Sequence, residues 1–114
     1  MNVVCIVGRL TATPTIKMTN SGLSVSSFRV AVNRGKEADF FDVTAWRQTA
    51  EYVCKYGQKG DTVEISGSLH TREWTDKDGN KRKAVEIVAQ QIHVRAAKRQ
   101  EQDFEVADDE DPPF

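Results

Sequence analysis

The segment DFFDVTAWRQTAEYVCKYGQKGDTVEISGSL, residues 39–69, contains a strand, a short helix and the start of a second strand in succession. In residues 39–46 the side chains alternate with the period of two that a β-strand requires. Residues 48–56 carry apolar side chains at helical spacing, and Gly57 follows them, as is typical of a helix end. Residues 62–74 alternate again and predict another strand.

This alternation assigns every second residue of the two strands to the core of the domain. The residues predicted to face the core are Phe41, Val43 and Ala45 in the first strand, and Val63, Ile65, Gly67 and Leu69 in the second. The opposite face of the first strand carries Phe40, Asp42, Thr44 and Trp46. Two large aromatic side chains on an outward face need a partner, because exposed apolar patches are unfavourable.

Three further strands precede this segment. Residues 3–10 are almost continuously apolar, so we expect this strand to be covered on both faces, by its own core and by another subunit. Residues 15–18 predict a short strand that ends in a turn. Residues 23–34 predict a longer strand whose apolar phase changes near Ser26 and Ser27, which indicates a bulge or strong coiling.

A last strand over residues 81–94 follows a turn at Asp78 and Gly79. Five main strands, with one helix between the third and the fourth, predict an all-β domain over residues 1–95. The expected architecture is the OB fold, a five-stranded Greek-key barrel. This fold binds oligonucleotides or sugars, but the fold alone does not determine the function.

The charge of the chain is divided between a basic body and an acidic end. Residues 1–100 contain all 16 Lys and Arg and 10 Asp and Glu, a net charge of +6, whereas residues 101–114 contain 7 acids and no Lys or Arg. A basic body indicates a polyanionic partner. Because no periodic pattern continues after the last strand, we expect a disordered tail, with a flexible linker over residues 96–106 and an acidic tip over residues 107–114.

The long hairpin predicted over residues 62–94 has Trp74 near its tip, where a role in the core is implausible. Its cations and histidine are His70, Arg72, Lys77, Lys81, Arg82 and Lys83. A tryptophan among cations indicates a finger that stacks on bases while its charges contact phosphates. A solvated charged hairpin is the alternative for this segment, and packing under a loop or a subunit is the alternative for Phe40 and Trp46.

The acidic tip has the composition of a peptide ligand. Its residues expected to contact a partner are Asp108, Asp109, Glu110, Asp111, Pro112, Pro113 and Phe114. A purely solubilising tail would have no reason to finish in a stiff Pro-Pro pair and an aromatic side chain beside a carboxylate. The expected receptor is an apolar pocket for Phe114 with Arg or Lys at its rim.

Catalysis finds little support in the sequence, and we expect no metal and no cofactor. No Walker loop, HExxH, GxSxG or CxxC motif is present. Cys5 and Cys54 are predicted to be small buried side chains in a reducing compartment. No apolar run approaches the ~20 residues of a membrane helix, and residues 1–5 lack the basic region of a signal peptide, so we expect a cytoplasmic protein.

An ordered set of motifs resembles the bacterial single-stranded DNA-binding protein family. The start of the chain, MNVVCIVGRL at residues 1–10, is similar to the opening of that family. The resemblance continues at Pro14, Thr19, Gly22, Phe28, Ala31, residues 40–46, Ala50, Glu51, Lys59, Gly60, Gly67, Leu69, Arg72 and Trp74, and again at residues 108–114. Each motif is weak alone, but the ordered set is specific.

The resemblance implies a set of DNA-binding residues. The stacking aromatic positions of the family match Phe40, Trp46 and Trp74, and its basic positions match Arg9, Lys17, Lys59 and Arg72. To these we add Lys77, Lys81 and Lys83 of the hairpin. Members of the family usually form homotetramers with dimers paired through their first strands, which agrees with the apolar residues 3–7.

Some features depart from the family pattern. The loop after Arg34 is short and lacks an aromatic residue found in many members. Asp42 stands where many relatives have a basic residue, which predicts a weaker patch of the DNA path. The linker is much shorter than the Gly/Gln-rich linkers of many members, which predicts limited cooperativity or a phage, plasmid or accessory copy.

The leading hypothesis is sequence-tolerant binding of single-stranded DNA at the nucleoid, in replication, recombination and repair, with partner proteins recruited by the acidic tip. An OB-fold RNA-binding protein or RNA chaperone is the alternative. A protein-interaction adaptor with incidental affinity for nucleic acid is a third hypothesis. An enzyme such as a nuclease is the weakest one, because no metal-binding cluster of carboxylates can be assigned.

Overall fold

The computed structural model describes residues 1–96, which form six strands and one helix. The elements are β1 (Val4–Leu10), β2 (Lys17–Met18), β3 (Ser24–Arg34), β4 (Glu37–Trp46), α1 (Arg47–Tyr56), β5 (Thr62–Thr75) and β6 (Lys81–Arg95). The predicted boundaries agree with these to within a few residues. The segment predicted as a short strand forms only the two-residue β2.

The strands close into a barrel because β1, at one end of the sheet, pairs with β5 and also with β3. The sheet has the order β1-β5-β6-β4-β3-β2, and β1 also pairs with β3, through Arg9 opposite Ala31 and Leu10 opposite Val30. The pairing of β4 with β6 is parallel and the others are antiparallel. A closed five-strand ring with a helix between its third and fourth strands confirms the predicted OB fold.

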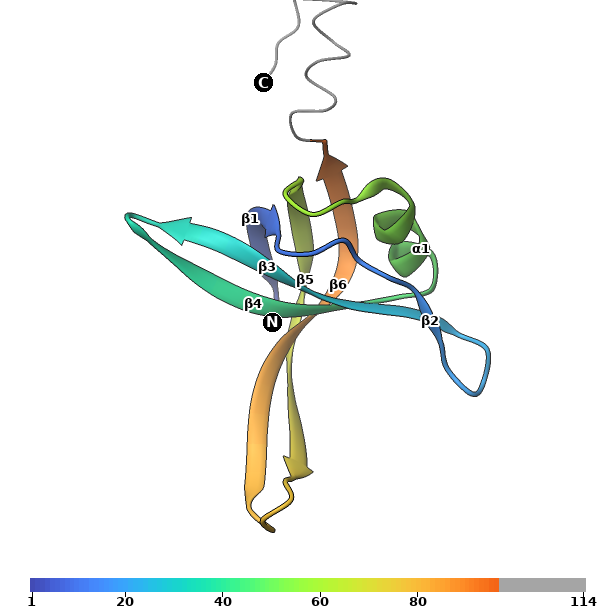
Figure 1. Cartoon of the computed structure of the whole chain (residues 1–114), viewed down its shortest axis with the longest axis vertical. Coiled ribbons are helices and arrows are strands. Elements are labelled where there is room, and N and C mark those ends of the chain that lie inside the picture. The colour runs from blue at the N-terminus through green and yellow to red at the C-terminus, as the bar shows by residue number, and fades with distance from the viewer. Residues whose placement is uncertain (97–114) are drawn as a thin grey trace, which may run out of the picture.

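The core lies inside this ring and under one side of α1, which packs against β3, β4 and β6 (Figure 1). Its buried apolar side chains are Leu10, Phe28, Val30, Val43, Ala45, Ala50, Val53, Val63, Ile65, Ile87 and Ala89. Gly57 follows α1 with a φ of −97°, which is not the left-handed conformation of a common glycine cap. A side chain there would collide with the carbonyl oxygen of Val53, so close packing accounts for the glycine.

Beyond the barrel, β5 and β6 continue as a projecting two-stranded ribbon, which we call the arm and define as residues 68–86 (Figure 1). The register between β5 and β6 shifts at Ser66 and Gly67, where the arm begins. A side chain on Gly67 would collide with the backbone carbonyl of Val88, so glycine is required at this boundary. The arm ends in the predicted turn, in which Gly79 has a φ of +83°.

Two predictions about buried residues were wrong at the ends of the barrel. Phe41 and Leu69 have the inward phase but are 36% and 45% exposed. Phe41 lies outside the short segment in which β4 pairs with β6, and Leu69 lies past Gly67 on the arm. Along β4 and β5, the inward-facing sequence pattern therefore continues past the part of each strand that other elements cover.

The predicted burial of both cysteines was also wrong, and of the two alternatives predicted for β3, a bulge or strong coiling, the bulge is not found. Cys54 is half-buried. Cys5 is exposed because its side chain lies on the outward side of β1, where exposed residues alternate with more buried ones. No register shift occurs in the pairing of β3 with β4 near Ser26. Instead, Ser26 itself occupies the inward position, and its hydroxyl donates a 2.9 Å hydrogen bond to the carbonyl oxygen of Thr15.

Candidate nucleic-acid interface

The outward side chains of β3 and β4 form one continuous face, because the two strands pair without a break over ten residue pairs. Phe40 and Trp46 project from this face and are 57% and 40% exposed. They are six residues apart on β4, which corresponds to about 20 Å along an extended strand. This spacing allows the two rings to stack on different bases of one nucleic-acid strand.

Each of these aromatic side chains is aligned with a cation across the sheet. Directly opposite residues of paired strands share a face, and neighbouring strands are about 4.8 Å apart. The backbone position of a cation two strands away is therefore about 10 Å from the backbone position of its aromatic partner. The two rows are Arg9, Ala31 and Phe40 at one end of the face, and Lys17, Val25 and Trp46 at the other.

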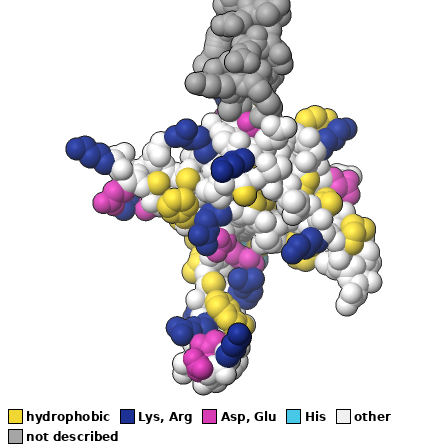
Figure 2. Space-filling view, viewed as in Figure 1, with side chains coloured by type: hydrophobic (Ala, Val, Ile, Leu, Met, Phe, Trp, Pro, Cys, Tyr) yellow, Lys and Arg dark blue, Asp and Glu magenta, His cyan; other side chains and the backbone are white. Residues whose placement is uncertain are grey.

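On the arm, Trp74 combines exposure with a neighbouring cation. Its side chain is 45% exposed, and the guanidinium carbon of Arg72 lies 5.5 Å from its ring centroid, within cation–π distance. The two residues share a face of β5 because they are two positions apart. Figure 2 shows Lys and Arg side chains beside hydrophobic ones along the arm.

The carboxylate of Asp76 organises the turn next to Trp74. It accepts hydrogen bonds of 2.9 Å from the backbone N–H groups of Asp78 and Asn80, and one of 2.8 Å from Arg82 Nε. The bond from Asn80, followed by that from Arg82, holds the pKa of the Asp76 carboxyl below its ordinary value. Arg82 is thereby fixed opposite Trp74 on the same face.

A hydrogen bond joins the arm to the face of β3 and β4. Thr44 of β4 donates to Glu86 of β6, with an Oγ1–Oε1 distance of 3.0 Å. Thr44 shares its side of β4 with Phe40 and Trp46, and Glu86 shares its side of the arm with Trp74. We call this continuous surface the aromatic face. It carries Arg9, Lys17, Phe40, Trp46, Arg72 and Trp74.

A comparison of sequences assigns the described part of the chain to a known family. The sequence model of the single-strand binding protein family matches residues 1–95. The chain belongs to this family. Its family membership therefore covers the whole barrel and the arm, the two parts of the molecule that form the aromatic face.

Several named proteins of the family are similar to this chain. A single-stranded DNA-binding protein of Oceanobacillus iheyensis is 35% identical over 105 residues, which cover 86% of this chain and 65% of that protein. Single-stranded DNA-binding protein 1 of Clostridium acetobutylicum is 37% identical over 108 residues, 88% of this chain and 98% of that protein. A single-stranded DNA-binding protein of Bacillus cereus is 41% identical over 76 residues, 60% of this chain and 45% of that protein. The chain thus spans less than two thirds of the first and third of these relatives.

Two lysines predicted to bind DNA lie away from the aromatic face of this family member. Lys81 and Lys83 stand opposite Thr75 and Glu73, on the other side of the arm from Trp74. Lys83 also lies 3.8 Å from a carboxylate oxygen of Glu73. The arm therefore has two different sides, and only one of them continues the aromatic face.

The remaining predicted residues are more dispersed. Lys77 lies in the turn of the arm, beyond the strands. Lys59 lies between α1 and β5, where its backbone N–H donates a 3.0 Å hydrogen bond to Thr13 Oγ1. The acidic tip, Asp108 to Phe114, and nearly all of the predicted linker lie outside the described residues.

Sequence reasoning missed Arg29 and Glu86 on the side of the sheet that carries the aromatic face, and it placed Thr44 on the outward side of its strand, where the structure leaves it only 9% exposed. Arg29 Nε donates a 3.1 Å hydrogen bond to Asp42, its directly opposite residue. Asp42 is the acid for which the resemblance predicts a weaker patch of the DNA path, and this pair compensates its charge. The alternation of Arg29 with the apolar residues of β3 could have placed it outward, but its partner depends on the register of β3 and β4.

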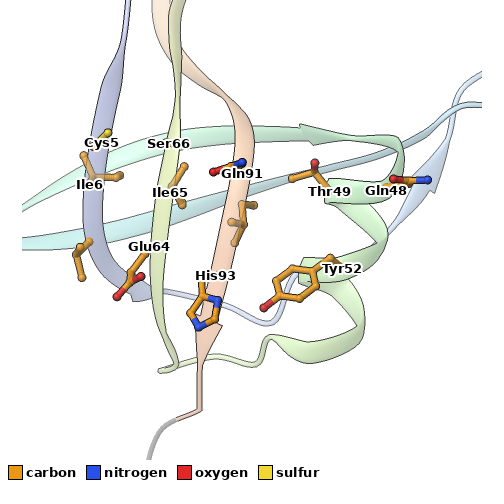
Figure 3. Close-up of a pocket in the computed structure, with 12 residues that line it drawn as sticks. Cys5, Ile6, Gln48, Thr49, Tyr52, Glu64, Ile65, Ser66, Gln91 and His93 are labelled. Carbon is orange, nitrogen blue, oxygen red and sulfur yellow. The ribbon is translucent and has the colours of Figure 1, made fainter. Parts of the chain in front are cut away.

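A separate hollow lies on the outward side of β1, β5 and β6, next to α1. It has a volume of about 640 Å³. Figure 3 shows Cys5, Glu64 and His93 on the three strands and Tyr52 on the neighbouring helix. None of the aromatic side chains of the aromatic face lines it.

Residues 1–96 contain no group of three or more His, Cys, Asp and Glu side chains placed to hold a metal ion. In the same residues, no helix has both the length and the apolar character needed to cross a membrane.

Proposed function

We propose that this chain binds single-stranded DNA with little dependence on sequence, and that it protects unpaired strands during DNA replication, recombination and repair. The observation that supports the proposal is the aromatic face, where three exposed aromatic side chains lie near cations. Every base has a π-face, and each base–aromatic stack contributes about 1–3 kcal/mol whatever the base. The family and the names of its similar members favour the same function.

The cations would give this binding its salt dependence. Arg9, Lys17 and Arg72 are exposed. Arg9 and Lys17 are aligned with Phe40 and Trp46 from two strands away, and Arg72 lies beside Trp74. Phosphate contacts release condensed counterions, so affinity falls as the salt concentration rises. We infer a binding protein of the cytoplasm and nucleoid that is not an enzyme.

We also propose that the chain forms a homo-oligomer, with a homotetramer as the expected state. β1 pairs with β5 along most of its length but with β3 only through its last two residues, so within residues 1–96 the second edge of residues 4–8 has no strand partner. On its outward side, Cys5 and Val7 are exposed, Val7 by 58%. An open strand edge with apolar side chains favours pairing with another copy. The mass in solution, with and without an oligonucleotide, tests this assembly.

The acidic tip is proposed to recruit proteins of replication and repair. Its four acids and terminal Pro-Pro-Phe sequence suit an apolar pocket rimmed by cations. Removal of residues 111–114 should abolish the binding of such partners and keep or strengthen DNA binding, because the tip competes with phosphates for the basic body. Weaker DNA binding after this truncation would contradict the assignment.

Titration of the full chain with oligo-dT, followed by tryptophan fluorescence, tests the main proposal. Strong quenching that added salt reverses is expected. Unchanged fluorescence together with no binding by a second method would reject DNA binding. Competition with a ribo-oligonucleotide separates DNA from RNA binding, because the 2′-OH distinguishes the two. Tighter binding of the ribo-oligonucleotide would favour the RNA alternative.

A further inference from the structure

The two cation rows of the aromatic face are widely separated. Arg9 is aligned with Ala31 and Lys17 with Val25, so the rows are six residues apart on β3. This corresponds to about 20 Å along the strand. Adjacent phosphates of a nucleic-acid strand are much closer together than this. A strand that contacts both rows therefore passes over the residues of β3 between them.

Arg29 is the cation that lies between the rows on the same face. It is two positions from Ala31 and four from Val25, so its side chain has the same outward phase. Its side chain is 58% exposed, and it stands on the strand next to the one that carries Phe40 and Trp46. A phosphate that crosses the middle of the face would come within reach of its guanidinium group.

The bond to Asp42 leaves most of this guanidinium group available. A guanidinium group has five N–H donors, and within residues 1–96 the hydrogen bond of Arg29 to Asp42 uses Nε, 3.1 Å from Oδ1. Exposed ion pairs of this kind add little to stability. The pair instead restrains the side chain, which is 58% exposed, while its terminal nitrogens keep N–H donors that a phosphate can accept from.

Arg34, on the hairpin of β3 and β4, differs from Arg29 in the number of acids that engage its guanidinium group. Its Nε lies 3.1 and 3.3 Å from the two carboxylate oxygens of Asp39, and its Nη2 lies 3.2 Å from Glu37. Two acids therefore engage Arg34, whereas one acid engages Arg29. The Arg34 and Asp39 pair is thus a matched control for the Arg29 and Asp42 pair.

We propose that Arg29 is a further phosphate-binding residue, which contacts the strand between the positions of Arg9 and Lys17. This inference rests on the proposed binding of single-stranded DNA. It changes the interpretation of Asp42, because the acid then holds a binding group in place and does not weaken the path.

The test compares the wild-type protein with the charge-neutral double variant R29Q/D42N, titrated with oligo-dT at several salt concentrations. The net charge is the same in both proteins, so a difference reports the local contact. We expect roughly tenfold weaker binding. The slope of log affinity against log salt should fall in magnitude by about 0.7, the value for one phosphate on a single strand.

The control double variant R34Q/D39N should keep the wild-type affinity and slope. Arg29→Lys should keep the slope, because a lysine also neutralises a phosphate. Arg29→Gln alone should reduce the magnitude of the salt slope as much as the double variant does. If one of these two variants fails to fold, the other still tests the inference. A double variant with wild-type affinity and slope would overturn the inference. Failure of the wild-type protein to bind would reject the proposed function instead.

Discussion

The two halves of the β5 and β6 pair have the same alternating sequence pattern in different surroundings. In the barrel half, β5 buries Val63, Ile65 and Gly67 at every second position. In the arm, Leu69 continues the same phase but is 45% exposed, and Val85 is 58% exposed. The barrel half is covered by α1, β1 and β4, whereas the arm extends away from these elements (Figure 1).

This difference shows that an alternating sequence pattern predicts a strand and which side chains share a face. It does not predict whether other elements cover that face. The barrel half stabilises the fold, and the arm uses the same backbone to present side chains on both of its sides. One of these sides, with Arg72 and Trp74, continues the aromatic face of the barrel. The other carries Lys83 and Val85.

The largest effect is expected where the two halves meet. Gly67→Ala places a methyl group against the carbonyl oxygen of Val88, so the backbone must shift. We expect the free energy of unfolding, measured by urea denaturation, to fall by about 3 kcal/mol, the upper range for overpacking. Thr71→Ala on the exposed arm is the control and should change it by less than about 0.5 kcal/mol. Equal stability of the two variants would show that glycine does not fix this boundary.

The sequence predicted much of the fold, because local patterns determine helix spacing and strand phase. The helix predicted over residues 48–56 and the strands β4 and β5, predicted from their alternating side chains, are examples of such local patterns. The exposure of Phe41 and Leu69 could not be predicted, since it depends on where the pairing of β4 with β6 ends and on where β5 and β6 leave the barrel as the arm.

The candidate site was predictable to a similar degree. Pattern and resemblance indicated Phe40, Trp46 and Trp74, which the structure leaves exposed. The pairing of Arg29 with Asp42, and the position of Lys83 on the far side of the arm, depend on strand register, which a single sequence does not fix.

The second-largest effect is expected on the affinity for single-stranded DNA, to which the two sides of the arm should contribute differently. Trp74→Ala is expected to lower the affinity for single-stranded DNA by about 1–3 kcal/mol, because one base loses its stacking partner. The loss should be alike for every base composition. Val85→Ala changes an apolar, exposed residue of the other side and should leave the affinity nearly unchanged. Fluorescence anisotropy with labelled oligonucleotides measures both, and a loss confined to one sequence would argue against stacking.

The smallest effect is expected at the turn of the arm and depends on pH. The pKa of Asp76 is lowered in the folded state, so its carboxylate stabilises the turn above its ordinary pKa. That contribution is lost as the pH falls through the lowered value. We expect lower amide protection at Asp78 and Asn80 in acid, and in Asp76→Asn at neutral pH, measured by hydrogen exchange corrected for intrinsic rates. The amide of Ile65 in the barrel is the control, and equal protection at the turn in all samples would contradict this role.

The central claim is that the barrel and the arm present one binding surface, and the two tryptophans of the chain report on it separately. Trp46→Phe leaves a reporter on the arm, and Trp74→Phe leaves one on the barrel. Titration of each variant with an oligo-dT of about 35 nucleotides, several OB footprints long, should quench both reporters at the same midpoint, and salt should reverse both signals. Quenching of one reporter without the other, or of neither, would contradict the claim.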